Sequence, residues 1–175
     1  MAIIKLVKKA QKGDEQAYIQ LFQQFEADIY RTAFVYVNNQ EDALDVVQEV
    51  AYRSFKKIKS LKQPKYFKTW LIRITIRCAV DLLNKRKKVV QLNTSYEELI
   101  EDEQDLDLSL ALSLEDIINQ LAPNEKSVVL LKYYYDYTFQ EISDVLEIPL
   151  GSAKSLLYRA IRKLRKDLEG SDFVE

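Results

Sequence analysis

The distribution of charge along the sequence divides this chain into two parts. Residues 1–88 contain 18 Lys and Arg against 9 Asp and Glu, whereas residues 89–118 contain 9 acidic residues and no basic one. The acidic core of that stretch, residues 97–107, carries too much charge to build an apolar core of its own. We therefore expect a first domain at residues 1–88, an acidic linker at residues 89–112 and a second domain at residues 113–170.

Both parts are predicted to be helical. The sequence has only three Gly and three Pro, and its apolar residues recur at spacings of three and four, as from Ala17 through Leu21 to Phe25. The predicted fold class is therefore all-α, with two small helical domains joined by the acidic linker. Helices are expected at about residues 3–11, 15–37, 40–58 and 67–88, and after the linker at about residues 114–121, 123–135, 138–146 and 151–168.

The third of these helices is expected to bury one face and to expose another. Its inward side chains are predicted to be Ala43, Leu44, Val47, Val50, Ala51 and Phe55. Its outward side chains are predicted to be Asp42, Asp45, Gln48, Glu49 and Arg53. This acidic face stands out within an otherwise basic first part.

The side chains needed for metal or disulfide chemistry are missing from this sequence. It has no histidine and a single cysteine, Cys78, which we interpret as a core residue and not as a nucleophile. We therefore expect no metal site and no cofactor. Nowhere do eighteen apolar residues follow one another, which predicts a cytoplasmic protein with a reduced thiol and no direct membrane insertion.

The last third of the sequence has the pattern of a helix-turn-helix. Thr138 and Glu141 form a capping box that opens a short helix, the segment Glu147 to Leu150 interrupts it, and a basic helix follows. An inward stripe is predicted at Ala153, Leu157, Ala160, Ile161, Leu164 and Leu168. This stripe leaves a polar face for solvent or DNA, which includes Ser152, Lys154, Ser155, Tyr158, Arg159, Arg162 and Lys163. An ordinary amphipathic helix with a solvated basic face remains the alternative.

The first part holds a second candidate for nucleic-acid binding. Basic residues of a loop and of the fourth helix alternate with aromatic ones, a combination that attracts phosphate and offers ring faces on which unpaired bases can stack. The residues are Lys59, Lys62, Tyr66, Trp70, Arg73 and Arg77. Alternatively, Trp70 and the neighbouring Phe67 fill the core, which we favour for Phe67 and leave open for Trp70.

Taken together, these motifs resemble the extracytoplasmic-function sigma factors, group 4 of the sigma-70 family. The resemblance covers roughly residues 3–168, and the motifs occur in the family's order. For region 2 they are Gly13-Asp14, Ala17-Tyr18, Leu21-Phe22, Glu41-Asp42-Ala43, Asp45 to Val50, Phe67 to Ile74 and Asp81-Leu82-Leu83. For region 4 they are Thr138 to Ile142, Ile148-Pro149, Gly151 to Ser155 and Tyr158-Arg159-Ala160.

The resemblance implies a role for each surface. Region 2 would bind core RNA polymerase through Asp42, Asp45, Gln48 and Glu49. It would also capture flipped bases of the single-stranded minus-ten element through Lys59, Lys62, Tyr66, Trp70, Arg73 and Arg77. Region 4 would read the double-stranded minus-thirty-five element through Ser152, Lys154, Ser155, Tyr158, Arg159 and Arg162. Promoter melting would be driven by binding, so no catalytic residue is required.

The family also implies partners and regulation. Its members serve as alternative sigma factors in stress responses, and each is usually held inactive by an anti-sigma factor, often one anchored in the membrane. The acidic linker would thread through basic channels of the polymerase as a mimic of nucleic acid.

Three positions depart from the family's pattern. Leu156 stands where the family usually has Arg, Arg77 where Asn is common, and Glu147 where a turn Gly is usual. The first two substitutions alter expected DNA contacts, and the third causes backbone strain if the residue at this turn is left-handed.

Two other functions compete with the sigma factor. A stand-alone helix-turn-helix regulator would need a dimerisation helix to bind DNA symmetrically, and we recognise none in the sequence. An enzyme acting on nucleic acid would need paired carboxylates at metal-ligand spacing, and these are not evident either.

Overall fold

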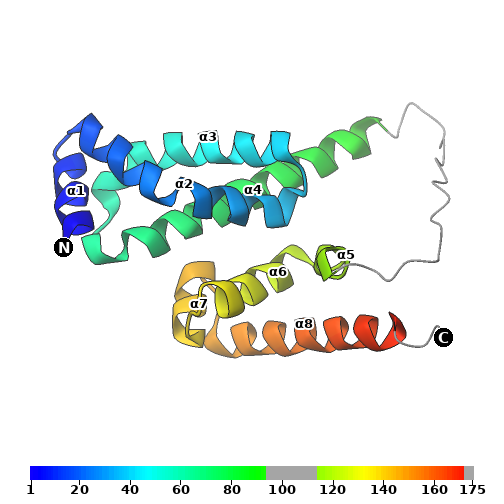
Figure 1. Ribbon diagram of the computed structural model, residues 1–175. Coiled ribbons are helices and arrows are strands. Elements are labelled where there is room, and N and C mark those ends of the chain that lie inside the picture. The colour runs from blue at the N-terminus through cyan, green and yellow to red at the C-terminus, as the bar shows by residue number, and fades with distance from the viewer. Residues whose placement is uncertain (94–113, 172–175) are drawn as a thin grey trace.

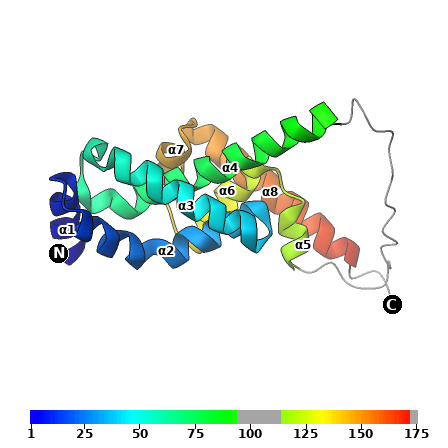
Figure 2. The same ribbon diagram turned by 90° about the horizontal axis from the view of Figure 1, so that it is seen from above.

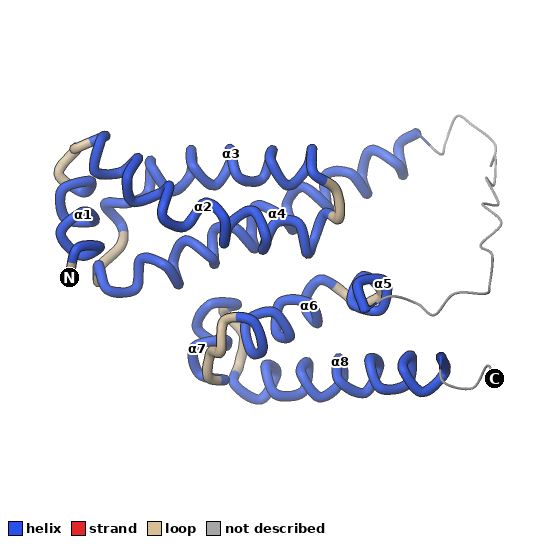
Figure 3. Tube along the Cα trace, in the orientation of Figure 1, coloured by secondary structure: helices blue, strands red, loops and turns tan. Residues whose placement is uncertain are grey.

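The structure is a computed structural model that describes residues 1–93 and 114–171. All of the regular structure in these two ranges is helical, which confirms the predicted all-α fold class (Figures 1 and 3). The first range holds α1 (Ala2–Gln11), α2 (Glu15–Val37), α3 (Gln40–Lys57), η1 (Ile58–Ser60), η2 (Pro64–Tyr66) and α4 (Phe67–Asn93). The second holds α5 (Leu114–Asn119), α6 (Pro123–Val129), η3 (Leu130–Tyr134), α7 (Phe139–Leu146) and α8 (Leu150–Ser171).

Local capping residues set the helix starts in the first module, which comprises α1 to α4. The Asp14 side chain accepts a hydrogen bond from the Ala17 amide at 3.0 Å, and the Asn39 side chain accepts one from the Asp42 amide at 2.9 Å. Asn38, between α2 and α3, has a φ of 59°, a left-handed conformation that Asn tolerates better than most residues. These short-range signals are why the helix starts matched the sequence-based expectation.

The core of the first module lies between α2, α3 and α4. Its largest fully buried side chains include Phe67, Leu21, Ile29 and Leu71. The Phe67 ring lies 5.7 Å from that of Phe25, a distance typical of packed aromatic pairs. The expectation that Phe67 belongs to the core is therefore confirmed. Helix α4 continues to Asn93, beyond the basic run at which the fourth helix was expected to end.

The orientation predicted for α3 is confirmed for most of its residues: Ala43, Val47 and Val50 are buried, and Asp45, Gln48 and Glu49 are exposed. Three side chains differ from the prediction. Asp42, expected to point outward, is buried, whereas Leu44 and Phe55, expected to point inward, are 46% and 45% exposed. The buried face instead uses Val46 and Ser54. Apolar residues occupy both sides of this helix, so the spacing alone fitted more than one orientation.

The second module, α5 to α8, packs the short helices against α8. Ile142 and Val145 of α7 meet Ala153, Leu157 and Ala160 of α8 in its core, so the inward stripe of the last helix is confirmed there. Leu168, at the far end of the stripe, is instead 46% exposed. The Thr138–Glu141 capping box is present, as expected. The sequence Ser113 to Asp116 also predicts a capping box, but Ser113 lies outside the described residues.

The two modules are stacked and share one apolar cluster. Figures 1 and 2 show α6 and α7 lying against the side of the first module that α2 and α4 form. Val128, Leu131 and Val145 belong to the same cluster of buried side chains as Ile29 and Leu71. The second module therefore packs on a face of α2 and α4 that is otherwise open.

We expect Phe67→Ala to lower the free energy of unfolding by about 3–5 kcal/mol, because it removes a fully buried phenyl ring and leaves a cavity. Tyr66→Ala is the matched control at the neighbouring position, where the side chain is 49% exposed. The control should lose less than about 1 kcal/mol. Urea unfolding followed by circular dichroism measures both losses, and equal losses would contradict this packing.

Candidate nucleic-acid interface

One face of α8 is free to contact DNA. Ser152, Lys154, Ser155, Tyr158, Arg159 and Arg162 are all exposed, and they lie opposite the buried stripe of Ala153, Leu157 and Ala160. The α7 segment and the turn before α8 hold this helix at one edge of the module (Figure 1). The structure therefore brings all six residues predicted for this surface together on one helix face.

The turn between α7 and α8 contains a left-handed residue. Glu147 follows α7 with a φ of 55° and a ψ of 45°, and the Ser143 hydroxyl donates a hydrogen bond to the Ile148 carbonyl at 2.6 Å. Glu147 is therefore left-handed, which is the condition under which the sequence predicts strain at this turn. A side chain other than Gly, Asn or Asp is disfavoured in this conformation, so this turn carries local strain.

One basic residue on this side of α8 serves the module's own stability. The Lys163 ammonium donates to the Glu125 carboxylate at 2.9 Å, and the same carboxylate accepts the Ala122 amide at 3.0 Å. Burial by itself would raise the pKa of Glu125, but the hydrogen bonds from Lys163 and Ala122 outweigh it and lower that pKa. Lys163 therefore neutralises a buried carboxylate, a role that sequence reasoning missed.

A second basic surface surrounds the start of α4. Trp70, Arg73 and Arg77 line a pocket of about 360 Å³ together with Arg53, Lys57, Ser60 and Ile74. Trp70 is half-buried, and its ring lies 5.8 Å from that of the core residue Phe67. Trp70 therefore combines the two roles considered for it: its ring packs on the core, and it also lines the pocket.

The remaining residues predicted for this surface come from the segment before α4. Lys59 lies in η1, Lys62 in the following loop and Tyr66 in η2, and all three are exposed. Lys59, Lys62 and Tyr66 do not line the Trp70 pocket. The predicted single-strand surface therefore consists of a pocket on α4 and an exposed basic loop beside it.

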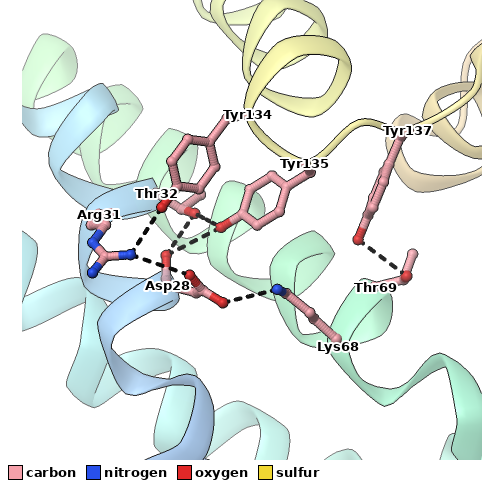
Figure 4. Close-up of polar contacts among 8 residues, drawn as sticks. All are labelled: Asp28, Arg31, Thr32, Lys68, Thr69, Tyr134, Tyr135 and Tyr137. Atoms are coloured by element: carbon pink, nitrogen blue, oxygen red, sulfur yellow. Dashed lines mark hydrogen bonds and ion pairs between the residues drawn. The ribbon is translucent and has the colours of Figure 1, made fainter.

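The second module covers part of this surface. The two carboxylate oxygens of Glu147 form ion pairs with Arg73 and Arg77 of α4. One turn earlier on α4, the Thr69 hydroxyl lies 3.2 Å from the hydroxyl of Tyr137 (Figure 4). The α4 face that carries the predicted minus-ten arginines thus contacts the other module.

A group of tyrosines provides the adjoining contacts between the modules. The Tyr135 hydroxyl lies 2.6 Å from that of Thr32 on α2, and Arg31 donates to the Tyr134 hydroxyl at 3.0 Å (Figure 4). Burial raises the pKa of Tyr135, so its hydroxyl stays protonated. Sequence reasoning assigned these residues no role, although four tyrosines among the five residues 133–137 are an unusual concentration.

The acidic face of α3 is smaller than expected. Asp45, Gln48 and Glu49 are exposed, but Asp42 is buried, accepts from the Asn39 side chain at 2.6 Å and pairs with Arg86 of α4. Asp42 thus joins the start of α3 to α4, which explains why its side chain turns inward.

Glu49 also takes part in a network between α3 and α4. Arg53 donates to Asp81 of α4 at 2.8 Å and to Glu49 at 2.5 Å, and these two hydrogen bonds raise the pKa of Arg53. Asp81 is exposed and adds a carboxylate to the acidic face that the sequence-based prediction did not include.

Within residues 1–93 and 114–171, no cluster of His, Cys, Asp or Glu could hold a metal ion. None of the helices described there is long and apolar enough to span a membrane. Cys78 is buried, as expected for a core residue, and burial raises the pKa of its thiol to about 11.

Two family models match the chain, one for each module. The Sigma-70 region 2 model matches residues 21–89, and the Sigma-70, region 4 model matches residues 111–164. The pocket beside Trp70 lies within the first match, and the exposed face of α8 lies within the second.

Curated relatives align along most of the chain. RNA polymerase sigma factor SigV of Bacillus subtilis is 30% identical over 145 residues, which cover 83% of this chain and 87% of SigV. ECF RNA polymerase sigma factor SigW of the same bacterium is 30% identical over 182 residues, which cover 96% of this chain and 97% of SigW.

Solved structures share the fold at lower sequence identity. CnrH, in complex with the cytosolic domain of CnrY, matches with a TM-score of 0.69 and 19% identity over 97% of this chain and 99% of CnrH. Sigma factor RpoE from Bartonella quintana, in complex with the anti-sigma factor NepR, matches with a TM-score of 0.69 and 20% identity over 87% and 96% of the two chains.

We expect Lys163→Met to destabilise the protein by about 1–2 kcal/mol near pH 7, because it removes the cation that pairs with a buried carboxylate. Lys166→Met, which changes an exposed lysine of the same helix, is the control. Because the pKa of Glu125 is lowered in the fold, its charge stabilises the protein above the unfolded pKa, near 4.3, and this contribution is lost as the pH falls. The gap between Lys163→Met and wild type should therefore shrink below about pH 4, as measured by urea unfolding.

Proposed function

This chain belongs to the extracytoplasmic-function sigma factors of the sigma-70 family, and we propose that it binds core RNA polymerase and directs it to promoters with two recognition elements. As an alternative sigma factor, it would direct the polymerase to a particular set of promoters. One observation carries the proposal: a region 4 match whose last helix exposes a complete polar and basic face.

We further propose that the chain is organised as region 2 at residues 1–88, a linker at residues 89–112 and region 4 at residues 113–170. The ends of the two family matches that face the linker, residues 89 and 111, lie within two residues of the proposed linker limits. The acidic core of the linker lies outside the described residues. Its proposed role is to occupy basic channels of the polymerase.

Region 4 would read the minus-thirty-five element with the exposed face of α8. Ser152 and Ser155, near the start of the helix, suit contacts to base edges, whereas Lys154 suits a phosphate. Arg159 and Arg162 lie one and two turns further on and can bind guanine or phosphate. Leu156 is half-buried and offers the DNA no charge.

Region 2 would bind the single-stranded minus-ten element at the pocket beside Trp70. The pocket combines an indole ring with four basic side chains, a composition suited to stacking a base and holding its phosphates. Its volume of about 360 Å³ is of the order expected for a small-ligand site. Lys59, Lys62 and Tyr66 would extend this surface along the strand.

The acidic face of α3 would bind the polymerase through Asp45, Gln48 and Glu49. Asp42 would contribute indirectly, since its buried carboxylate joins α3 to Arg86 and holds the helix in place. The exposed apolar side chain of Leu44 lies on the same helix and would add contact area.

We propose an anti-sigma factor, anchored in the membrane, as the regulatory partner in a stress response. Support comes from the two structures of the same fold, one solved with an anti-sigma factor and one with a partner's cytosolic domain. The proposed setting is cytoplasmic, with no enzymatic activity and no membrane insertion by this chain itself. A stand-alone regulator is not favoured, since the chain matches both region 2 and region 4.

Runoff transcription tests the main proposal. Core RNA polymerase would be incubated with this chain on a library of genomic fragments, and the start sites sequenced. The expected result is a set of start sites that share two elements at a fixed spacing, absent without the chain. Initiation at random sites, or none, would overturn the proposal.

We expect Asp45→Lys to weaken binding to core polymerase about tenfold or more, equivalent to about 1.4 kcal/mol, because it reverses a charge in the proposed interface. Asp144→Lys makes the same change at an exposed position of α7, outside that interface, and should bind as wild type does. Affinity for immobilised core enzyme measures the difference, and circular dichroism checks that both variants fold. Equal affinity for the two variants would refute the assignment of α3.

A further inference from the structure

Two of the departures from the sigma-factor pattern contact each other. Glu147 stands where the family usually has a turn Gly, and Arg77 stands where Asn is common. In the structure the Glu147 carboxylate pairs with the Arg77 guanidinium across the interface between the two modules. The chain thus has an inter-module ion pair that the usual Gly and Asn could not form.

The backbone at Glu147 favours a glycine, yet a glutamate occupies it. The residue is left-handed, with a φ of 55°, and its side chain is 56% exposed, so apolar burial does not explain the choice. What the side chain gains is contact with two cations: one oxygen pairs with Arg73 and the other with Arg77. The carboxylate therefore compensates for backbone strain by an interaction with the other module.

The contacted residues form one stripe on α4. Thr69, Arg73 and Arg77 are spaced by four, so they lie above one another on the same helix face. Tyr137 contacts the first of them, and Glu147 contacts the other two. The second module thus covers this stripe continuously along two turns of α4.

Arg73 and Arg77 form a site that favours an anion. Two guanidinium groups one turn apart repel each other, and a carboxylate between them relieves that repulsion. The Nε atom of Arg73 is buried and has no hydrogen-bond partner among the described residues. A phosphate would bind the same two groups with its own charge, so Glu147 and a nucleic-acid backbone would exclude each other.

We propose that Glu147 is an internal competitor of DNA: it occupies Arg73 and Arg77, holds region 4 against α4, and must leave before a single strand can bind there. The inference rests on the proposed use of these arginines for the minus-ten element. The closed state, in which region 4 packs on α4, and the strand-bound state exclude each other. A change that lowers the equilibrium constant for closing by some factor therefore raises the apparent affinity for the strand by up to that factor. Weakening the Glu147 contact therefore activates the minus-ten surface.

The experiment follows opening and binding in the full-length chain. Cysteines introduced at Lys8 on α1 and Lys166 on α8, both exposed positions, carry a donor and an acceptor dye. The native Cys78 is buried, and burial raises the pKa of its thiol to about 11, so we expect this thiol to react much more slowly than the two introduced cysteines. The ligand is single-stranded dT12, whose phosphates serve as the probe, with a fluorescent form for binding by anisotropy.

Glu147→Gln removes the charge and keeps the side-chain length. Exposed ion pairs are weak, so the dT12 concentration that opens half of the molecules should fall about fivefold. Glu147→Gly should give a similar fall and also relieve the backbone strain, so that opening is not accompanied by loss of thermal stability. Asp144→Asn removes the same charge three residues away and should change that concentration by less than about twofold.

Two results of the dT12 experiment would overturn the proposal. One is a half-opening concentration for Glu147→Gln equal to that of Asp144→Asn. The other is dT12 binding, measured by anisotropy, with no change in dye separation.

A further variant separates this inference from the proposed function. In the Glu147→Gly background no side chain remains to contact the arginines, so Arg77→Gln reports only the contribution of Arg77 to strand binding. A weaker affinity supports the minus-ten role of Arg77, and an unchanged affinity refutes that role. Runoff transcription without any effect of Glu147→Gln would instead leave the sigma-factor function standing and refute competition at Glu147.

Discussion

The packing of α2, α3 and α4 around one apolar core is the constraint on which both proposed region 2 surfaces depend. Phe67 and Leu71 fix the rotation of α4, because both are fully buried. With that rotation fixed, Arg73 and Arg77 must lie on a face that α2 and α3 do not cover. On α3, burial of Val46 and Val50 likewise leaves Asp45 and Glu49 exposed. The core thus determines where the charged surfaces lie, although it contains none of their residues.

Features set by short-range interactions were predictable from the sequence. The caps at Asp14 and Thr138 each bond to an amide three residues along, left-handed Glu147 directly follows α7, and left-handed Asp136 lies two residues after the end of η3. The exposed face of α8 was predictable for a related reason, since its buried stripe is narrow and regular. The burial of Asp42 was not predictable, because its carboxylate is compensated by Arg86, which lies 44 residues away.

The interface between the modules lies beyond what periodicity can indicate. Tyr135 reaches Thr32 over a sequence separation of 103, and Tyr36 reaches Ser127 over 91. In each case a buried or half-buried ring ends in a hydroxyl that needs a partner, and only the tertiary arrangement supplies one. A tyrosine-rich segment without helical spacing is nevertheless a usable signal. Two of its four rings, those of Tyr135 and Tyr137, are half-buried, and their hydroxyls contact Thr32 and Thr69 of the first module.

The exposure of each carboxylate separates contacts that hold the fold together from contacts that can be exchanged. Asp42 and Glu125 are buried, and loss of the cation from such a pair costs about 3–5 kcal/mol when both charges are fully buried. The Arg86 and Lys163 side chains are half exposed, so the free energy lost on removing either cation is smaller than this range. Both pairs nevertheless stabilise the fold, because their carboxylates are buried. Glu147 is 56% exposed, and exposed pairs contribute only about 0–1 kcal/mol. An anion that brings several phosphates to the same arginines can displace a contact of that size without unfolding either module.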